Sequence, residues 1–181
     1  MKALTRFFLI LLFLHTSVAN AGWVDEQGGA VADTDGMKST GDFISRLIVT
    51  DQGDEAFKAL STPARGAAFQ NSNTIKRNSP LTVAIAFAGC KANAKGNCYM
   101  LMQVTITQPD GEIYAKLPVT EMWFGKPRPG DGKLEVGSNV MQIVIENEDP
   151  LGKYRIDTKV MDKMSGKKLL LTSHFTAIEP N

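Results

Sequence analysis

Histidine is scarce in this chain of 181 residues, and its scarcity restricts the catalytic chemistry open to the protein. Of the two histidines, His15 lies in a segment that we expect to be removed, which leaves His174. A zinc site of several histidines is thereby excluded, and a Ser-His-Asp arrangement would depend on one imidazole. Every second residue from Leu169 to Phe175 belongs to one largely apolar face, so His174 should point to the opposite, wetter face of a strand. We interpret it as an exposed strand residue.

Charge of either sign is not in excess, since 20 Lys and Arg residues stand against 19 Asp and Glu residues. A near-neutral protein has no long-range field to gather polyanions, and no basic stretch is interleaved with aromatic residues, so nucleic acid is not an expected partner. The phosphate-cradling pattern G-x-x-x-x-G-K-[ST] is absent, and no two acids are placed on facing walls of a cleft as glycoside hydrolysis would need. We therefore expect a non-catalytic binding or structural protein, with a ligand- or calcium-binding domain as the alternative and a hydrolase of dispersed site as the less favoured one.

Long apolar runs are absent after the N-terminus, and the one at the N-terminus is short. Lys2 and Arg6 precede an apolar run over 7–14, and the small-residue triplet at 19–21 follows it. This order is typical of a secretory signal peptide, whereas a membrane-spanning helix needs about 20 apolar residues. We predict a signal peptide over 1–21, cleavage before Gly22, a mature chain with a net charge of about −1, no stable membrane anchor, and a periplasmic or secreted location.

Only two cysteines occur, Cys90 and Cys98, and they flank a turn-like loop. In an oxidising compartment such a pair is expected to form a disulfide, with a stabilisation of about 2.5 kcal/mol for so small a loop. The C-x-x-C spacing of redox-active pairs is missing. We interpret the pair as structural.

Residues 22–42 are rich in Gly, Asp and Thr and show hardly any hydrophobic periodicity, so we predict a flexible N-terminal arm. Trp23 is its one large apolar side chain, either a docking anchor or an exposed aromatic. The domain should then extend over 43–181, with one short helix at Asp54–Leu60, where Phe57 and Leu60 have helical spacing.

From residue 43 onwards apolar and polar residues alternate with period two, as in half-buried strands. We therefore predict an all-β fold, an immunoglobulin-like antiparallel β-sandwich of about seven strands. The expected strands are Phe43–Thr50, Leu81–Ala88, Cys98–Thr107, Glu112–Phe124 with a break at Pro118, Val140–Glu146, Lys153–Met161 and Lys168–Ile178.

The run Asp149–Tyr154, followed by an alternating strand, a Ser165-Gly166 turn and a last strand, resembles the closing hairpin of immunoglobulin-like domains. In that family a tyrosine at the start of the penultimate strand closes a corner by bonding to upstream backbone, and Tyr154 holds the matching place. Cys90 and Cys98 are too close in sequence for the inter-sheet bridge of antibody domains, so the resemblance concerns architecture.

A second resemblance rests on several short motifs. They are Phe87-Ala88-Gly89-Cys90, Gly96-Asn97-Cys98, Pro109-Asp110-Gly111, Trp123 with Gly125-Lys126-Pro127, and Asp149–Tyr154. Together they are similar to a family of exported bacterial proteins with an immunoglobulin-like β-sandwich and no assigned activity. The resemblance implies fold and export, and it implies no mechanism.

Trp123 and Phe124 lie next to a Pro/Gly-rich loop that carries Lys126 and Arg128. Trp123 could pack in the core, or the four residues could form a recognition surface for another envelope or secreted protein. Sheet edges and the arm are further contact candidates.

The acidic residues Asp110, Glu146, Glu148 and Asp149 fall in predicted loops that could meet at one end of the sandwich. Oxygen ligands of this kind could hold Ca²⁺, which takes six to eight of them. The competing interpretation is a solvated loop, in which Asp149 initiates a turn before Pro150. No other cofactor is expected.

Overall fold

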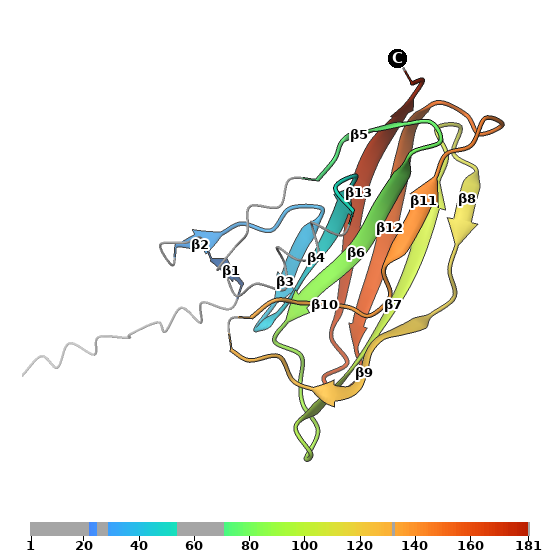
Figure 1. The fold of residues 1–181 in the computed structure, drawn as a ribbon. Helices are drawn as coiled ribbons and strands as arrows, with labels where there is room; N and C mark the ends of the chain where they lie inside the picture. Colours follow the sequence, from blue (N-terminus) through green and yellow to red (C-terminus); the bar gives the residue numbers. More distant parts are fainter. Residues whose placement is uncertain (1–21, 25–28, 54–70, 132, 181) are drawn as a thin grey trace, which may run out of the picture.

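The computed structural model describes residues 22–24, 29–53, 71–131 and 133–180. These residues contain no helix, and their strands form two main sheets packed face to face (Figure 1). The fold is an all-β sandwich, which confirms the predicted class. The expected signal peptide over 1–21 and the expected helix at Asp54–Leu60 lie outside the described residues.

The first sheet is centred on strand β6 and has the order β10-β6-β4-β3, with β11 also paired to β6. Its pairs are antiparallel, and β10 and β11 occupy successive parts of the same edge of β6. The strands are β3 (Met37–Thr40), β4 (Phe43–Thr50), β6 (Pro80–Ala88), β10 (Glu135–Val136) and β11 (Met141–Val144).

The second sheet has the order β5-β13-β12-β7-β8, and β9 also pairs with β7. A break at Pro118 separates β8 from β9, as the sequence predicts, because proline cannot donate to a central ladder. Both strands run antiparallel to β7 along the same edge. The short β5 runs parallel to β13, so the sheet is mixed where an antiparallel one is predicted. The strands are β5 (Thr74–Lys76), β7 (Asn97–Thr107), β8 (Ile113–Lys116), β9 (Thr120–Pro127), β12 (Gly152–Asp162) and β13 (Lys168–Ile178).

The core lies between the sheets and follows the alternation of the sequence. On β12, Tyr154, Ile156, Thr158 and Val160 are buried, while the intervening side chains are exposed or half-buried. The same alternation holds along β7 and β13. Because successive side chains of a strand point to opposite faces, each of these strands contributes one face to the core.

Strand β6 departs from one-sided burial, because both of its faces are covered. Ala84 and Ala86, on the face away from the main core, pack with Ile48 of β4 in a second small cluster. Leu134 and Val136 cover this cluster. A central strand buried on both faces needs small or apolar residues at every position, and β6 has them from residue 81 to residue 88.

The sheet begins earlier in the chain than the predicted boundary at residue 43, since β3 lies within the segment predicted to be a flexible arm. β3 hydrogen bonds along the edge of β4, where backbone groups would otherwise be unpaired. Further upstream, β1 (Trp23–Val24) and β2 (Ala30–Val31) form a small separate sheet. The indole N–H of Trp23 donates to the carbonyl of Lys38 at 3.3 Å, and Trp23 is buried. Trp23 is therefore a docking anchor.

Candidate functional site

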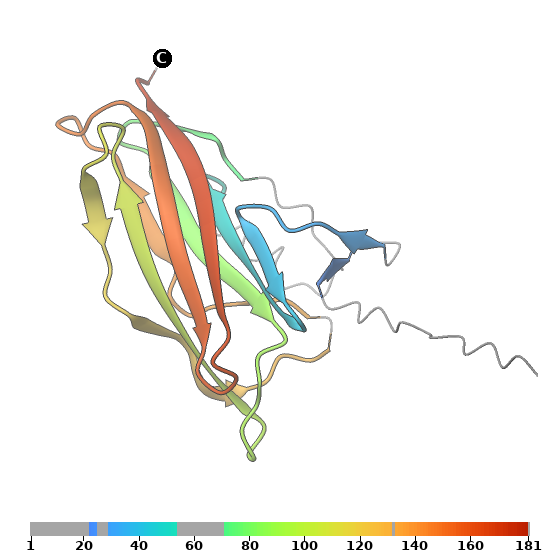
Figure 2. The ribbon, with the colours of Figure 1, turned by 180° about the vertical axis from the view of Figure 1, so that it is seen from behind.

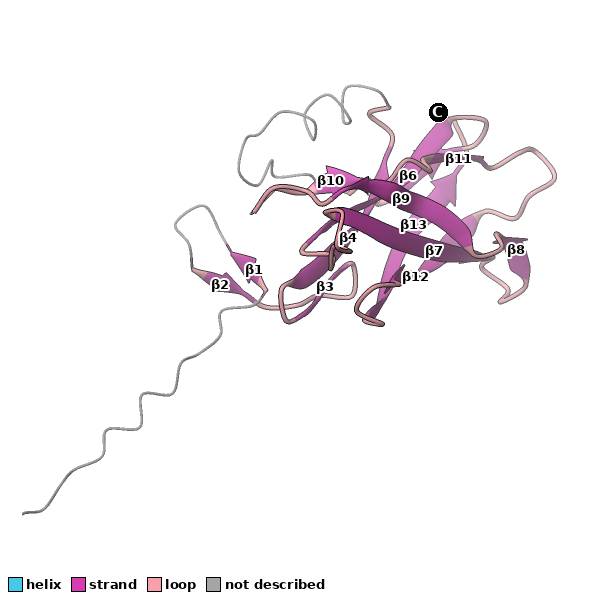
Figure 3. Cartoon of the chain, turned by 90° about the horizontal axis from the view of Figure 1, so that it is seen from below, coloured by secondary structure: helices cyan, strands magenta, loops and turns pink. Residues whose placement is uncertain are grey.

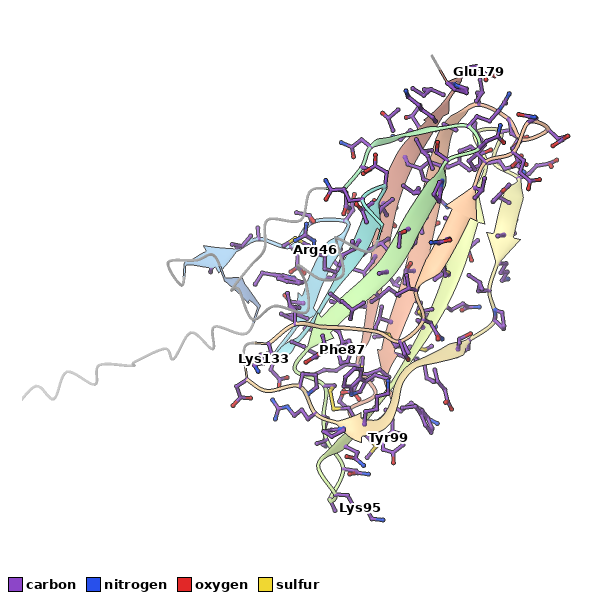
Figure 4. The ribbon with its side chains drawn as sticks, in the orientation of Figure 1. Arg46, Phe87, Lys95, Tyr99, Lys133 and Glu179 are labelled. Carbon is purple, nitrogen blue, oxygen red and sulfur yellow. A yellow bond between two sulfur atoms is a disulfide. The ribbon has the colours of Figure 1, made fainter. Side chains whose placement is uncertain are left out.

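The long strands run lengthwise through the molecule, so their connections gather at two ends (Figure 1). One end holds the turn 41–42 and the loops 89–96, 128–131 and 163–167, and we call it the disulfide end. The opposite end holds loops 77–79, 108–112 and 145–151 and the C-terminal residues. Figure 4 labels Lys95 and Lys133 at the disulfide end and Glu179 at the opposite end.

The predicted disulfide is present and anchors the loop between β6 and β7. Cys90 and Cys98 are both buried, with their Cα atoms 6.1 Å apart. The residue before Cys90 is Gly89, with φ near +70°, and a Cβ atom there would collide with the backbone carbonyl of Asp42. Glycine at 89 and the disulfide therefore fix where β7 starts, and β9 pairs with that start.

Strand β9 is irregular beside the disulfide, and this irregularity decides where its two aromatic rings point. Its register against β7 shifts twice, so that Trp123 pairs with Met100 and Phe124 with Tyr99. Met100 faces the core, so Trp123 faces it too, and its ring meets that of Phe87 edge to face at 5.6 Å. Phe124 points to the opposite, outer face. Of the two aromatics, Phe124 is the one available to a partner.

Lys126 and Arg128 make their contacts with residues other than Phe124. The ammonium of Lys126 sits 4.8 Å from the centroid of the Trp123 ring, whose N–H donates to the carbonyl of Pro127 at 3.0 Å. Arg128 lies in an exposed turn 3.5 Å from Asp131. Trp123 and Lys126 therefore contact each other at the edge of the core, and Phe124 and Arg128 are not part of this contact.

On the outer face Phe124 is joined by residues that sequence reasoning did not single out. The Tyr99 and Phe124 rings meet edge to face at 4.7 Å, and the ammonium of Lys163 lies 5.6 Å from the Phe124 centroid. The backbone N–H of Lys163 donates to the carbonyl of Tyr99 at 2.9 Å, which holds the β12–β13 turn against β7. Phe124 itself is 40% exposed.

Three more apolar side chains continue this outer surface across the sheet. Leu101 follows Tyr99 on the same face of β7 and is paired with Met161 of β12. Leu170 of β13 is paired with Lys159, two residue pairs along from the pair of Met161 with Lys168, and is 68% exposed. We call Tyr99, Leu101, Phe124, Met161 and Leu170 the apolar band. Figure 2 shows the outer face of this sheet, with β7, β12 and β13 towards the viewer.

Lysines surround the apolar band. Lys163 and Lys168 are exposed at its end, and Lys159 is half-buried beside Leu170. Within the part of the chain that the structure describes, none of these three forms an ion pair. An exposed apolar patch with a charged rim is typical of a surface that binds a partner.

Charge is divided between the two ends, although the chain is nearly neutral overall. Basic residues dominate the disulfide end, which Figure 3 views end-on. They are Lys91, Lys95, Lys126, Arg128, Lys133, Lys163, Lys167 and Lys168, against Asp42, Glu121, Asp131, Glu135 and Asp162. The opposite end has the reverse balance, with Asp51, Asp110, Glu112, Glu146, Glu148, Asp149 and Glu179 against Lys76, Arg77 and Lys153.

Three of the five acids of the disulfide end have partners. Lys167 donates to Asp42 at 2.9 Å, and this hydrogen bond lowers the pKa of the Asp42 carboxyl. Asp131 lies beside Arg128. Asp162 is buried and accepts hydrogen bonds from the backbone N–H of Lys91 and from the hydroxyl of Ser165. The remaining lysines therefore leave this end with an excess of positive charge.

At the opposite end, Asp149 closes the turn before β12. Its carboxylate accepts hydrogen bonds from the backbone N–H of Glu146 at 2.7 Å and from the hydroxyl of Tyr114 at 3.0 Å. Tyr154 donates to the carbonyl of Pro150 at 2.7 Å, which is the bond that a tyrosine corner makes. Burial and the bond to Asp149 raise the pKa of Tyr114 to about 12.

The four acids considered as calcium ligands do not converge. Asp110 accepts from the backbone N–H of Glu112 in its own turn at 3.0 Å, and Glu146 and Glu148 are exposed in another loop. Across the described ranges, no three His, Cys, Asp or Glu side chains are placed to hold one metal ion.

His174 is half-buried on the outer face of β13, opposite Arg155 of β12. Its neighbour Ser173 is buried on the other face, so the two side chains point apart. Among the described residues, no hydrogen bond joins the His174 imidazole to a serine, cysteine or carboxylate. The arrangement offers His174 no nucleophile to activate.

An open cavity of about 240 Å³ lies beside Arg46, lined among others by Gly36, Asn71 and Thr172. Burial lowers the pKa of the Arg46 guanidinium. The amide of Asn71 is engaged with the backbone of Leu47 and Val49. The volume is below the roughly 300 Å³ at which small-molecule sites begin, and the sequence contains no motif that points to it.

No protein-family model matches the chain, and a comparison with curated proteins finds no match. No helix among the described residues is long and apolar enough to cross a membrane. A family 123 glycoside hydrolase from Clostridium perfringens is similar in structure with a TM-score of 0.42 and 10% identity, over 75% of this chain. This chain corresponds to 28% of the length of that hydrolase.

Two smaller proteins are also similar at low identity. One is a Niemann-Pick type C2 protein from the Japanese carpenter ant, with a TM-score of 0.41 and 8% identity over 73% of this chain and 89% of that one. The other is the CARDB domain of a Pyrococcus furiosus protein, with a TM-score of 0.39 and 11% identity over 82% and 95%. Similarity at this level extends to β-sandwich architecture and does not extend to activity.

Proposed function

We propose that the protein is an exported, non-catalytic binding module that recognises another envelope or secreted protein. The contact surface in this proposal is the outer face of the β7–β12–β13 sheet at the disulfide end. One observation carries it: the apolar band extends over β9, β7, β12 and β13 on one face of the sheet, exposes Phe124 and Leu170, and has lysines around it. Aromatic side chains of this kind are enriched where proteins meet.

The scaffold under the apolar band is rigid, which suits a recognition surface. Strands β7, β12 and β13 are paired along most of their length, and the disulfide holds the start of β7. Phe124 is held by Tyr99 from one side and approached by Lys163 from the other. A surface ordered before binding loses less conformational entropy when the partner arrives.

Export is supported by chemistry as well as by the N-terminal sequence pattern. Disulfides persist in oxidising compartments and are rare in the cytosol, and both cysteines of this chain are joined. The absence of an activated nucleophile next to His174 favours binding over hydrolysis as the role of the domain.

Photo-crosslinking tests the location of the binding surface. Phe124 and Leu170 are each replaced by a photoreactive phenylalanine analogue, and the cells that produce the protein are irradiated. We expect covalent adducts with the same protein from both positions, because both lie in the apolar band. The measurement is the mass of the adducts on a denaturing gel and the identity of the attached protein by mass spectrometry.

Ile113 provides the matched control, because it is 60% exposed on β8, near the opposite end. The analogue at Ile113 should give no adduct with that protein. Adducts from Ile113 equal to those from Phe124, or none from either band position, would contradict the proposed surface.

A further inference from the structure

We infer that the partner of the apolar band is an acidic polypeptide surface, one that carries carboxylates around a few apolar or aromatic side chains. This inference rests on the proposed function and adds the chemistry of the partner. It is drawn from the excess of lysines around the band, from the position of Lys163 above Phe124, and from the lack of ion pairs to these lysines within the described ranges.

The lysines around the band are available to an external carboxylate. Lys159, Lys163 and Lys168 lie on or beside the outer face and form no ion pair within the described ranges. Asp42 and Asp162 at this end are engaged with Lys167 and with backbone and hydroxyl donors. Glu121, exposed opposite Leu101, is one carboxylate against the three lysines. Complementary charge around an interface guides association and selects the partner.

The apolar part of the band requires more than charge from the partner. Leu170 and Phe124 are the most exposed side chains of the band, and polyanions without apolar groups would leave both in water. Burying such side chains contributes roughly 25 cal/mol for each Å² removed from water. A partner with both carboxylates and apolar side chains can pair with the lysines and also bury Phe124 and Leu170.

The position of Lys163 favours a polypeptide over a glycan or a lipid surface as the partner. Its ammonium lies over the Phe124 ring, 5.6 Å from the centroid, and so covers the ring face that a sugar would stack on. Insertion of Phe124 into the apolar layer of a membrane would carry that ammonium with it, and burying an unpaired charge is strongly unfavourable. A carboxylate can pair with the ammonium while the ring edge contacts an apolar side chain.

Two polymers test this inference on the full mature protein: poly-L-glutamate, and a copolymer of glutamate and tyrosine. Binding is measured by fluorescence anisotropy of labelled polymer at salt concentrations of about 0.01 M and about 1 M, where charge screening is weak and strong. We expect both polymers to bind at low salt, the copolymer more tightly by about tenfold, and poly-L-glutamate to be released at high salt.

Three variants assign the binding to the band. K163E/K168E should weaken both polymers by at least about tenfold, which corresponds to 1.4 kcal/mol. F124S should remove the advantage of the copolymer and leave poly-L-glutamate unchanged. K76E/K153E, which changes the net charge equally at the opposite end, should bind both polymers as the unchanged protein does. Circular dichroism and thermal melting show that each variant is folded.

Three results would overturn the inference: no binding of either polymer, equal losses in K163E/K168E and K76E/K153E, or a copolymer no better than poly-L-glutamate. Binding to phosphatidylglycerol vesicles that F124S abolishes, with no polymer bound, would assign the band to a membrane surface instead. If the polymers do not bind as expected but crosslinking gives adducts from Phe124 and Leu170 and none from Ile113, only the acidic chemistry of the partner is rejected. Absence of those adducts would reject the proposed function itself.

Discussion

Single side chains at the opposite end show how local chemistry links the two sheets. The hydroxyl of Tyr114 of β8 lies 2.9 Å from the carbonyl oxygen of Val144 and 3.0 Å from Asp149 Oδ2 and shares its one proton between these acceptors, so it joins the edge of one sheet to the loop that leaves the other. Its ring meets Tyr154 edge to face, and Tyr154 stacks on Phe175. The corner tyrosine is therefore the middle of a three-ring series that leads from this loop into the core.

Tyr114 should make the stability of the protein sensitive to alkaline pH. Its pKa is raised from 10.0 to about 12 by burial first and by the bond to Asp149 second. Above about pH 10 the unfolded chain ionises this phenol while the folded chain keeps it neutral. Its contribution to stability is therefore fully present below pH 10 and is lost as the pH rises towards 12.

Urea unfolding between pH 8 and pH 11 checks this expectation, with pH values chosen around the ordinary tyrosine pKa of about 10. Y114F should be less stable by about 1–2 kcal/mol at neutral pH, since it loses a hydrogen bond, and should lose less further stability above pH 10. Y99F removes a phenol from the outer face and should keep the alkaline slope of the unchanged protein. Parallel alkaline losses in Y114F and the unchanged protein would contradict this role.

At the scale of elements, the start of β7 depends on the disulfide, because β9 pairs there through an irregular register. Reduction should lower the free energy of unfolding by about 2.5 kcal/mol, the loop-entropy estimate for a bridge of this span. It should also speed amide hydrogen exchange near Cys98 and Tyr99 more than near Ile106 and Thr107. Urea unfolding and exchange measured by mass spectrometry check both effects.

C90A/C98A in the absence of reductant is the matched variant, since it removes the bridge without adding polar atoms to a buried position. It should show the same local increase in exchange as the reduced protein. Equal acceleration of amide exchange along the whole of β7 would contradict this expectation. It would show that the disulfide stabilises the domain as a whole and not the start of β7 in particular.

The strands show which elements the sequence could predict. The long alternating segments are predicted to within a residue or two except at the end of β9, which extends three residues beyond the predicted Phe124, and β4 and β13 match their predicted bounds. The missed elements, β1, β2, β3, β5 and β10, are too short to show a period, and β3, β5 and β10 are strands because a neighbouring strand offers an unpaired edge. The sequence of such a short segment does not show that a neighbouring strand will offer it an unpaired edge.

For the whole molecule, the distribution of charge matters more than its sum. The near-neutral total predicts no long-range field, yet basic residues outnumber acidic ones at the disulfide end and acidic residues outnumber basic ones at the opposite end. Residues far apart in the chain, such as Lys95, Lys133 and Lys163, come to one end because antiparallel strands return the chain there. The preferred partner chemistry follows from this placement.

Export should leave a mature chain that begins at Gly22. Intact mass spectrometry of protein from the periplasmic fraction and the medium should find residues 1–21 removed, because small residues at 19 and 21 suit the peptidase. A21L should retain the signal, whereas A30L, beyond the junction, should be processed normally. A full-length chain in the cytoplasmic fraction would contradict export.

By itself the sequence determined what depends on near neighbours in the chain. Alternation specified the long strands and the class of fold, the Cys90 and Cys98 spacing specified the disulfide, and the run before Tyr154 specified the corner. Only the tertiary structure decided that Phe124 faces outward while Trp123 faces the core, that Trp23 docks on β3, and that the apolar band is continuous. These properties depend on register and pairing between distant strands, and no local pattern encodes which residues become neighbours across a sheet.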